Sequence, residues 1–107
     1  MPPTYIEQLE LHTNRPSLVY EVLVQMMPTA IILINTEVGA DEEIFEKLKN
    51  IPEVKQVYMV YGLYDIVAIV ESEDLNKLRD IVYNRVRSMP KVKSTLTMIV
   101  VKGLSKK

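Results

Sequence analysis

The fold is decided by residues 29–55, TAIILINTEVGADEEIFEKLKNIPEVK, which recur as residues 67–93, VAIVESEDLNKLRDIVYNRVRSMPKVK. The two stretches align without a gap at a constant offset of 38 residues (90 − 52). The identical pairs are Ala30/Ala68, Ile31/Ile69, Pro52/Pro90, Val54/Val92 and Lys55/Lys93. Each copy has the pattern of a strand, an amphipathic helix, a proline-marked turn and a second strand. The repeat therefore predicts an α+β fold of the ferredoxin-like βαββαβ type, with a four-stranded antiparallel sheet and two helices on one face.

Turn and cap signals divide each copy into elements. Asp41 precedes the first helical pattern and Asp74 is expected to cap the second, which carries Leu75 and Leu78 inward. The intervening strands are predicted at residues 54–61 and 64–70, joined by a short turn in which Gly62 can take a positive φ. The last strand is predicted at residues 92–101.

Both faces of the predicted sheet are apolar. In the first strand Ala30, Ile32 and Ile34 alternate with Ile31 and Leu33. Right-handed crossovers put both helices on one face, so the other face needs a different cover. Four strands about 4.8 Å apart and roughly 20 Å long expose about 400 Å², a size that marks an interface. A second copy packed sheet against sheet is the predicted cover, giving a dimeric α+β barrel-type assembly, and the N-terminal segment is the competing one.

Composition limits the function. The chain has 107 residues, enough for one domain, with 25% charged residues and a net charge of −1. It therefore lacks the basic field that attracts nucleic acid. The absence of cysteine excludes thiol chemistry and iron–sulfur ligation, and no cofactor is predicted. With no signal-peptide pattern and no apolar run of roughly 20 residues, a soluble, cytoplasmic protein is expected.

Several short motifs resemble the ligand-binding half of the Lrp/AsnC regulators, known as the RAM (regulation of amino acid metabolism) domain. The resemblance lies in residues 51–57 (IPEVKQV), residues 60–67 (VYGLYDIV) and residues 93–100 (KSTLTMIV). Its most specific element is the Gly-x-Tyr-Asp step at residues 62–65. It divides the chain into an N-terminal extension at residues 1–28, a RAM domain at residues 29–103 and a tail at residues 104–107.

The resemblance implies a non-enzymatic, amino-acid-sensing module that dimerises through its sheets and assembles further, as a tetramer or an octameric ring of dimers. Effectors in such proteins sit near the Gly-x-Tyr-Asp turn and the last strand. The implied ligand-binding residues here are Gly62, Leu63, Tyr64, Asp65, Thr95 and Thr97. A zwitterion needs a carboxylate for its ammonium group and N–H or hydroxyl donors for its carboxylate, and these residues offer both.

Structural roles compete with these assignments. Asp65 can serve only to cap its turn, and Thr95 and Thr97 can be simple strand formers. A small dimeric α+β barrel enzyme is an alternative, but with His12 as its only histidine the chain offers few acid–base groups. A pure assembly adaptor that binds no ligand is the other alternative.

The chain departs from the full-length family before the first strand. Those regulators carry a winged helix-turn-helix domain of roughly 50 to 60 residues there, whereas only 28 residues precede Thr29. A stand-alone module is therefore expected, which does not bind DNA directly but can co-assemble with full-length Lrp/AsnC regulators.

Overall fold

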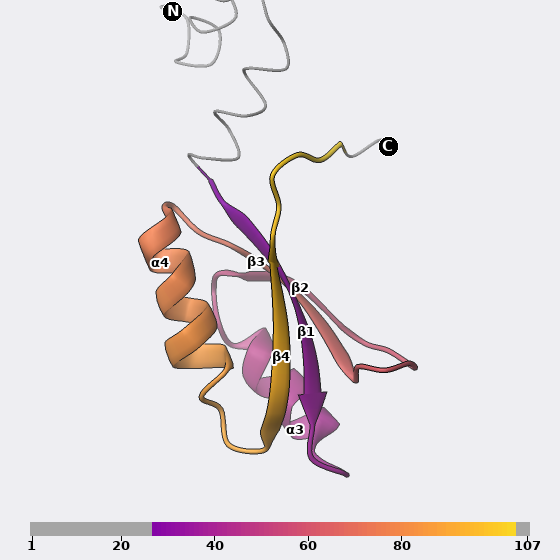
Figure 1. The fold of residues 1–107 in the computed structure, drawn as a ribbon. Helices are drawn as coiled ribbons and strands as arrows, with labels where there is room; N and C mark the ends of the chain where they lie inside the picture. The colour runs from indigo at the N-terminus through magenta and orange to yellow at the C-terminus, as the bar shows by residue number, and fades with distance from the viewer. Residues whose placement is uncertain (1–26, 105–107) are drawn as a thin grey trace, which may run out of the picture.

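The computed structural model describes residues 27–104 as four strands, two α-helices and a π-helical segment that continues the second helix (Figure 1). In chain order these are β1 (Thr29–Thr36), α3 (Asp41–Lys49), β2 (Val54–Met59), β3 (Ile66–Glu71), α4 (Leu75–Asp80), the π-helical segment η1 (Ile81–Val86) and β4 (Val92–Ile99). The strands form one sheet in the order β2-β3-β1-β4, and every pair is antiparallel. The ferredoxin-like βαββαβ prediction is confirmed. Residues 1–26 of the N-terminal extension, which include His12, and most of the predicted tail lie outside the described residues.

The core forms between one face of the sheet and the helices (Figure 1). In β1 and β3 every second residue is buried, fully so except at Thr36, as the alternation in the sequence predicts. Helices α3 and α4 add Leu48 and Leu78 to the same cluster. The buried strand residues are Ala30, Ile32 and Ile34 in β1 and Ile66, Ala68 and Val70 in β3.

The second helix agrees with the prediction at its cap but not along its whole face. The Lys77 N–H donates to the Asp74 carboxylate at 2.7 Å, which confirms the N-cap. Leu75, predicted to point inward, is 41% exposed. The helix then widens into η1, where the Arg87 N–H donates to the Val82 carbonyl five residues earlier at 2.9 Å.

An ion pair ties α3 to the turn before β4. Lys91 Nζ lies 3.0 Å from Glu43 Oε2, and the Lys91 carbonyl accepts a hydrogen bond from the Glu37 N–H. Lys91 itself has a φ of 73°, so this turn holds a non-glycine residue in the left-handed region. The hydrogen bond and the positive charge of Lys91 lower the pKa of the Glu43 carboxyl below its ordinary value.

The lowered pKa predicts a pH dependence for the stability of the fold. The Glu43–Lys91 pair stabilises the folded state at pH values above the ordinary pKa of 4.5, and this contribution disappears as pH falls through the lowered folded-state pKa. We expect Glu43→Gln to lower the free energy of unfolding slightly at neutral pH, with the difference from wild type vanishing in acid. Urea titrations at several pH values measure this difference in the free energy of unfolding.

Glu42→Gln, which removes a neighbouring carboxylate with no ion pair within residues 27–104, is the control. A Glu43→Gln difference that does not change with pH would contradict this assignment.

Candidate functional site

The Gly-x-Tyr-Asp step forms the loop between β2 and β3, and Asp65 fixes that loop to β1. The Thr36 N–H donates to Asp65 Oδ2 at 2.8 Å, and the Thr36 hydroxyl lies 3.4 Å from the same oxygen. The Asp65 N–H donates to the Ile34 carbonyl, while the Asp65 carbonyl accepts from the Val60 N–H, both at 2.9 Å. Three hydrogen bonds in the normal distance range therefore hold this half-buried residue in one position.

A cavity of about 260 Å³ opens beside Asp65. Its lining residues are Asp41, Met59, Val60, Tyr61, Gly62 and Asp65. The structure thus brings together two of the predicted site residues, Gly62 and Asp65. Leu63 and Tyr64 do not line this cavity, and Leu63 is almost fully exposed. Gly62 does not have the predicted positive φ; within residues 27–104 the glycine that does is Gly39, between β1 and α3.

The loop carries groups that suit a zwitterion. No hydrogen bond between described residues uses Asp65 Oδ1, so one oxygen of the fixed carboxylate is free to accept. The N–H groups of Gly62 and Leu63 likewise donate to no other described residue. A fixed acceptor and two donors without a partner among the described residues therefore lie within a few residues of each other in this loop, and two of the three residues, Gly62 and Asp65, line the cavity.

The two threonines of β4 lie elsewhere. Thr95 and Thr97 pair with Ile34 and Ile32, whose side chains are buried under the helices, so both threonines face the helix side of the sheet. Thr97 lines a second cavity, of about 200 Å³, with residues of α4, η1 and β4, and Thr95 lines neither cavity. The predicted six-residue site is therefore divided in this chain.

Asp41 was missed by sequence reasoning, although the topology contains a signal for it. In an antiparallel β1·β3 pair, the end of β1 lies beside the start of β3. The loop leading from β1 to α3 must then lie near the β2–β3 loop. Asp41, the first residue of α3, is brought to the cavity in this way.

The sheet face away from the helices is apolar in the described chain. We call it the open face; its apolar side chains are Ile31, Leu33, Tyr58, Val67, Ile69, Leu96 and Met98. Those on the two central strands are half-buried by their neighbours, while those on the edge strands are exposed. Apolar side chains also project from loops at one end of the sheet, where Val38, Tyr61 and Leu63 are almost fully exposed.

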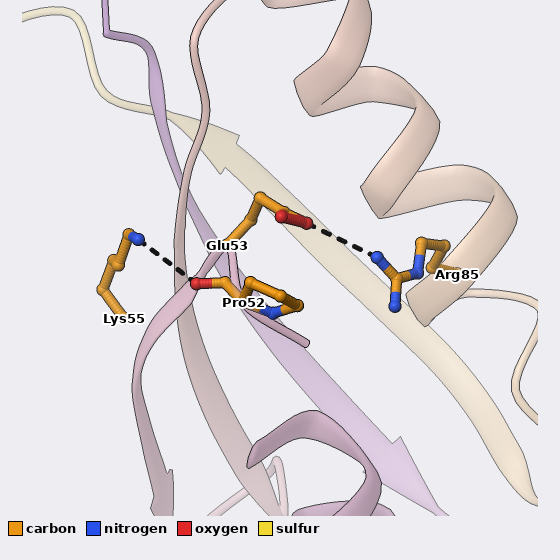
Figure 2. A network of polar contacts seen from close by, with 4 residues as sticks. All are labelled: Pro52, Glu53, Lys55 and Arg85. Carbon is orange, nitrogen blue, oxygen red and sulfur yellow. Dashed lines mark hydrogen bonds and ion pairs between the residues drawn. The ribbon is translucent and has the colours of Figure 1, made fainter. Parts of the chain in front are cut away.

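A larger cavity, of about 400 Å³, lies at the start of β2 and includes Met27, the first described residue. Several of its charged groups already have partners (Figure 2). Arg85 lies 3.4 Å from the Glu53 carboxylate, and the Lys55 ammonium donates to the Pro52 carbonyl at 3.2 Å. The Glu53–Arg85 pair links the turn at Pro52 to η1, and the Lys55–Pro52 hydrogen bond lies within the turn region itself. No predicted site residue lines this cavity.

The described part of the chain contains neither a cluster of metal-binding side chains nor a membrane-spanning helix. No group of three or more histidine, cysteine or acidic side chains within residues 27–104 could hold a metal ion. None of the helices in the same range is long and apolar enough to cross a bilayer.

Comparisons with known proteins find similar sequences and a similar fold. A family model described as the Lrp/AsnC ligand binding domain matches residues 29–107. The transcriptional regulator FL11 of Pyrococcus furiosus is 35% identical over 100 residues, which is 91% of this chain and 60% of the regulator. The crystal structure of FFRP-DM1 superposes with a TM-score of 0.68 at 42% identity, covering 69% of this chain and 99% of that one.

One similarity falls outside the regulators. Homocitrate synthase of Sulfurisphaera tokodaii is 43% identical over 58 residues, which is 54% of this chain but only 12% of the synthase. A segment of this kind therefore occurs both in regulators and in a small part of a much longer enzyme.

Proposed function

The chain belongs to the Lrp/AsnC ligand-binding-domain family, and on that premise we propose that it binds a free amino acid as its effector and assembles through its sheets. In this proposal it modulates transcription or amino acid metabolism without itself contacting DNA. Full-length Lrp/AsnC regulators and further copies of the same chain are its proposed partners. The relatives that carry the domain are chiefly transcriptional regulators, which favours a non-enzymatic role.

The observation that supports an amino acid effector is the arrangement around Asp65. Within residues 27–104 the Asp65 Oδ1 has no hydrogen-bond partner and suits an ammonium group, and the N–H groups of Gly62 and Leu63 donate to no described residue and suit a carboxylate. Asp65 and Gly62 line a cavity of about 260 Å³ whose other walls include Met59 and Val60, and Leu63 follows Gly62 in the same loop. The polar ends can thus be recognised while an apolar wall accommodates a side chain.

Self-assembly is supported by the open face and by the loop beside the cavity. Burying the open face against a second copy would remove its exposed edge-strand side chains from water. Tyr61, nearly fully exposed, stands at the rim of the cavity and offers an aromatic contact to a further dimer. The effector would then be covered by a neighbouring subunit.

The effector proposal predicts ligand-dependent stabilisation. A ligand that binds only the folded protein raises the free energy of unfolding by RT ln(1 + [L]/Kd), about 2.7 kcal/mol at one hundred times Kd. We expect one or a few of the twenty amino acids at millimolar concentration to raise the melting temperature by several degrees. Differential scanning calorimetry with each amino acid measures it.

The control ligand is the N-acetyl derivative of whichever amino acid stabilises most, because acetylation removes the ammonium charge. Stabilisation by the parent compound but not by the derivative supports recognition at Asp65. If none of the twenty shifts the melting temperature, the effector proposal fails and assembly alone remains.

A further inference from the structure

Asp41 places a second carboxylate in the cavity beside Asp65. The two residues come from different segments, since Asp41 begins α3 and Asp65 precedes β3. Both are half-buried and both line the same space of about 260 Å³. The six lining residues include no lysine, arginine or histidine, so within residues 27–104 no basic side chain of the cavity wall neutralises either charge.

In the proposed function Asp41 does not bind the ammonium group or the carboxylate group of the effector. In the proposed function the ammonium group uses Asp65, and the carboxylate group uses the loop N–H groups of Gly62 and Leu63. Within residues 27–104 the Asp41 carboxylate accepts no hydrogen bond and forms no ion pair. Asp41 does line the cavity in which the effector would bind.

We infer that Asp41 is a specificity-determining residue, which restricts the effector to amino acids with uncharged or positively charged side chains and rejects acidic ones. This inference rests on the proposed function and concerns the same cavity. Because the effector's ammonium group would compensate Asp65, the charge left uncompensated is that of Asp41, and an acidic side chain in the same cavity would be repelled by it. Selection by repulsion against the wrong ligand is a common route to specificity.

The size of the effect follows from partial burial. Exposed like-charge contacts change a binding constant only a few-fold, whereas buried ones have much larger effects. For half-buried groups we expect wild type to bind an amide over the matching acid by about tenfold in Kd, which is 1.4 kcal/mol. Because the cavity is open to solvent, the ratio should fall as salt is raised.

A stability role for Asp41 must be separated from a binding role. Asp41 lies in the first turn of α3, where a carboxylate also interacts favourably with the helix dipole. Glu42 shares that turn but does not line the cavity. Asp41→Asn and Glu42→Gln therefore each remove one charge from the same helix end, and only the first removes a charge from the cavity.

The experiment titrates wild type, Asp41→Asn and Glu42→Gln by calorimetry with all twenty amino acids, using glutamine against glutamate and asparagine against aspartate as matched pairs. We expect every wild-type ligand to have an uncharged or positive side chain. Asp41→Asn should bind the acidic amino acids about tenfold more tightly than Glu42→Gln does, and Glu42→Gln should behave as wild type.

Two outcomes overturn the inference while the proposed function survives. One is that wild type binds an acidic amino acid as tightly as its amide. The other is that the acidic amino acids bind no better to Asp41→Asn than to Glu42→Gln although another amino acid binds to both. If no amino acid binds wild type at all, the proposed function fails and this inference falls with it.

Discussion

Replacing Leu96 with aspartate is expected to convert the proposed sheet-against-sheet assembly into a folded monomer. Leu96 lies on the open face opposite Leu33, and 46% of its surface is exposed in the single chain. In a two-fold sheet-against-sheet dimer the substitution introduces two carboxylates at once. Aspartate is too short to reach solvent from a covered face, and each unpaired buried charge costs several kcal/mol. Association should therefore weaken by about a thousandfold or more.

The matched control is Leu75→Asp. Leu75 is 41% exposed, close to the value for Leu96, but it lies in the first turn of α4, on the helix side of the sheet. An acidic residue at that helix end is favourable. Light scattering after size exclusion should give half or less of the wild-type mass for Leu96→Asp and the wild-type mass for Leu75→Asp. A wild-type monomer, or a Leu96→Asp variant of unchanged mass, would refute assembly through the open face.

The second large effect is expected at Asp65, where two substitutions separate anchoring from binding. Asparagine keeps an oxygen that can accept the Thr36 N–H, now at 2.8 Å, but removes the negative charge. Alanine removes both and leaves the Thr36 N–H without its partner, which costs about 1–3 kcal/mol of stability. We expect both variants to lose at least about a hundredfold in affinity for the effector, since a charge-assisted contact to its ammonium group is lost. Only Asp65→Ala should also unfold at a clearly lower urea concentration than wild type.

Asp74→Asn is the control for this comparison. Asp74 also holds a backbone N–H, that of Lys77, but it does not line the cavity beside Asp65. Asparagine is as good an N-cap as aspartate, so neither stability nor affinity should change much. Isothermal titration and urea denaturation of the three variants make the test. If Asp65→Asn binds the effector as wild type does, Asp65 serves only to cap its turn.

The elements of the fold were predictable because their signals are local. The 38-residue repeat indicated the order of strands and helices, and alternation in β1 identified Ala30, Ile32 and Ile34 as the buried set. Asp74 was recognisable as an N-cap from its position before an apolar helical pattern. The alternation and the N-cap depend on residues close together in the sequence, and the repeat requires only that two stretches of the sequence be compared. The other residues of the same strands are also apolar, and this pattern indicated that the sheet has a second apolar face, the open face.

Local pattern was insufficient where a residue's surroundings come from distant segments. Leu75 fits the apolar period of its helix, yet it lies at the helix start beyond the edge of the core and is exposed. Thr95 and Thr97 were grouped with the Gly-x-Tyr-Asp turn, whereas the register of β4 on β1 turns both toward the helices. A shift of one residue in that register would reverse their direction, and the sequence of β4 alone does not fix it.

The βαββαβ fold, the two apolar sheet faces and the turn that carries Asp65 can be read from the sequence, because hydrophobic period and turn chemistry are properties of neighbouring residues. Three features become visible only in the folded chain: Asp65 is bonded to Thr36, Asp41 lines the same cavity as Asp65, and Thr95 and Thr97 do not line that cavity. A cavity forms where segments far apart in the sequence come together, and which segments come together depends on strand register and on the geometry of the crossovers.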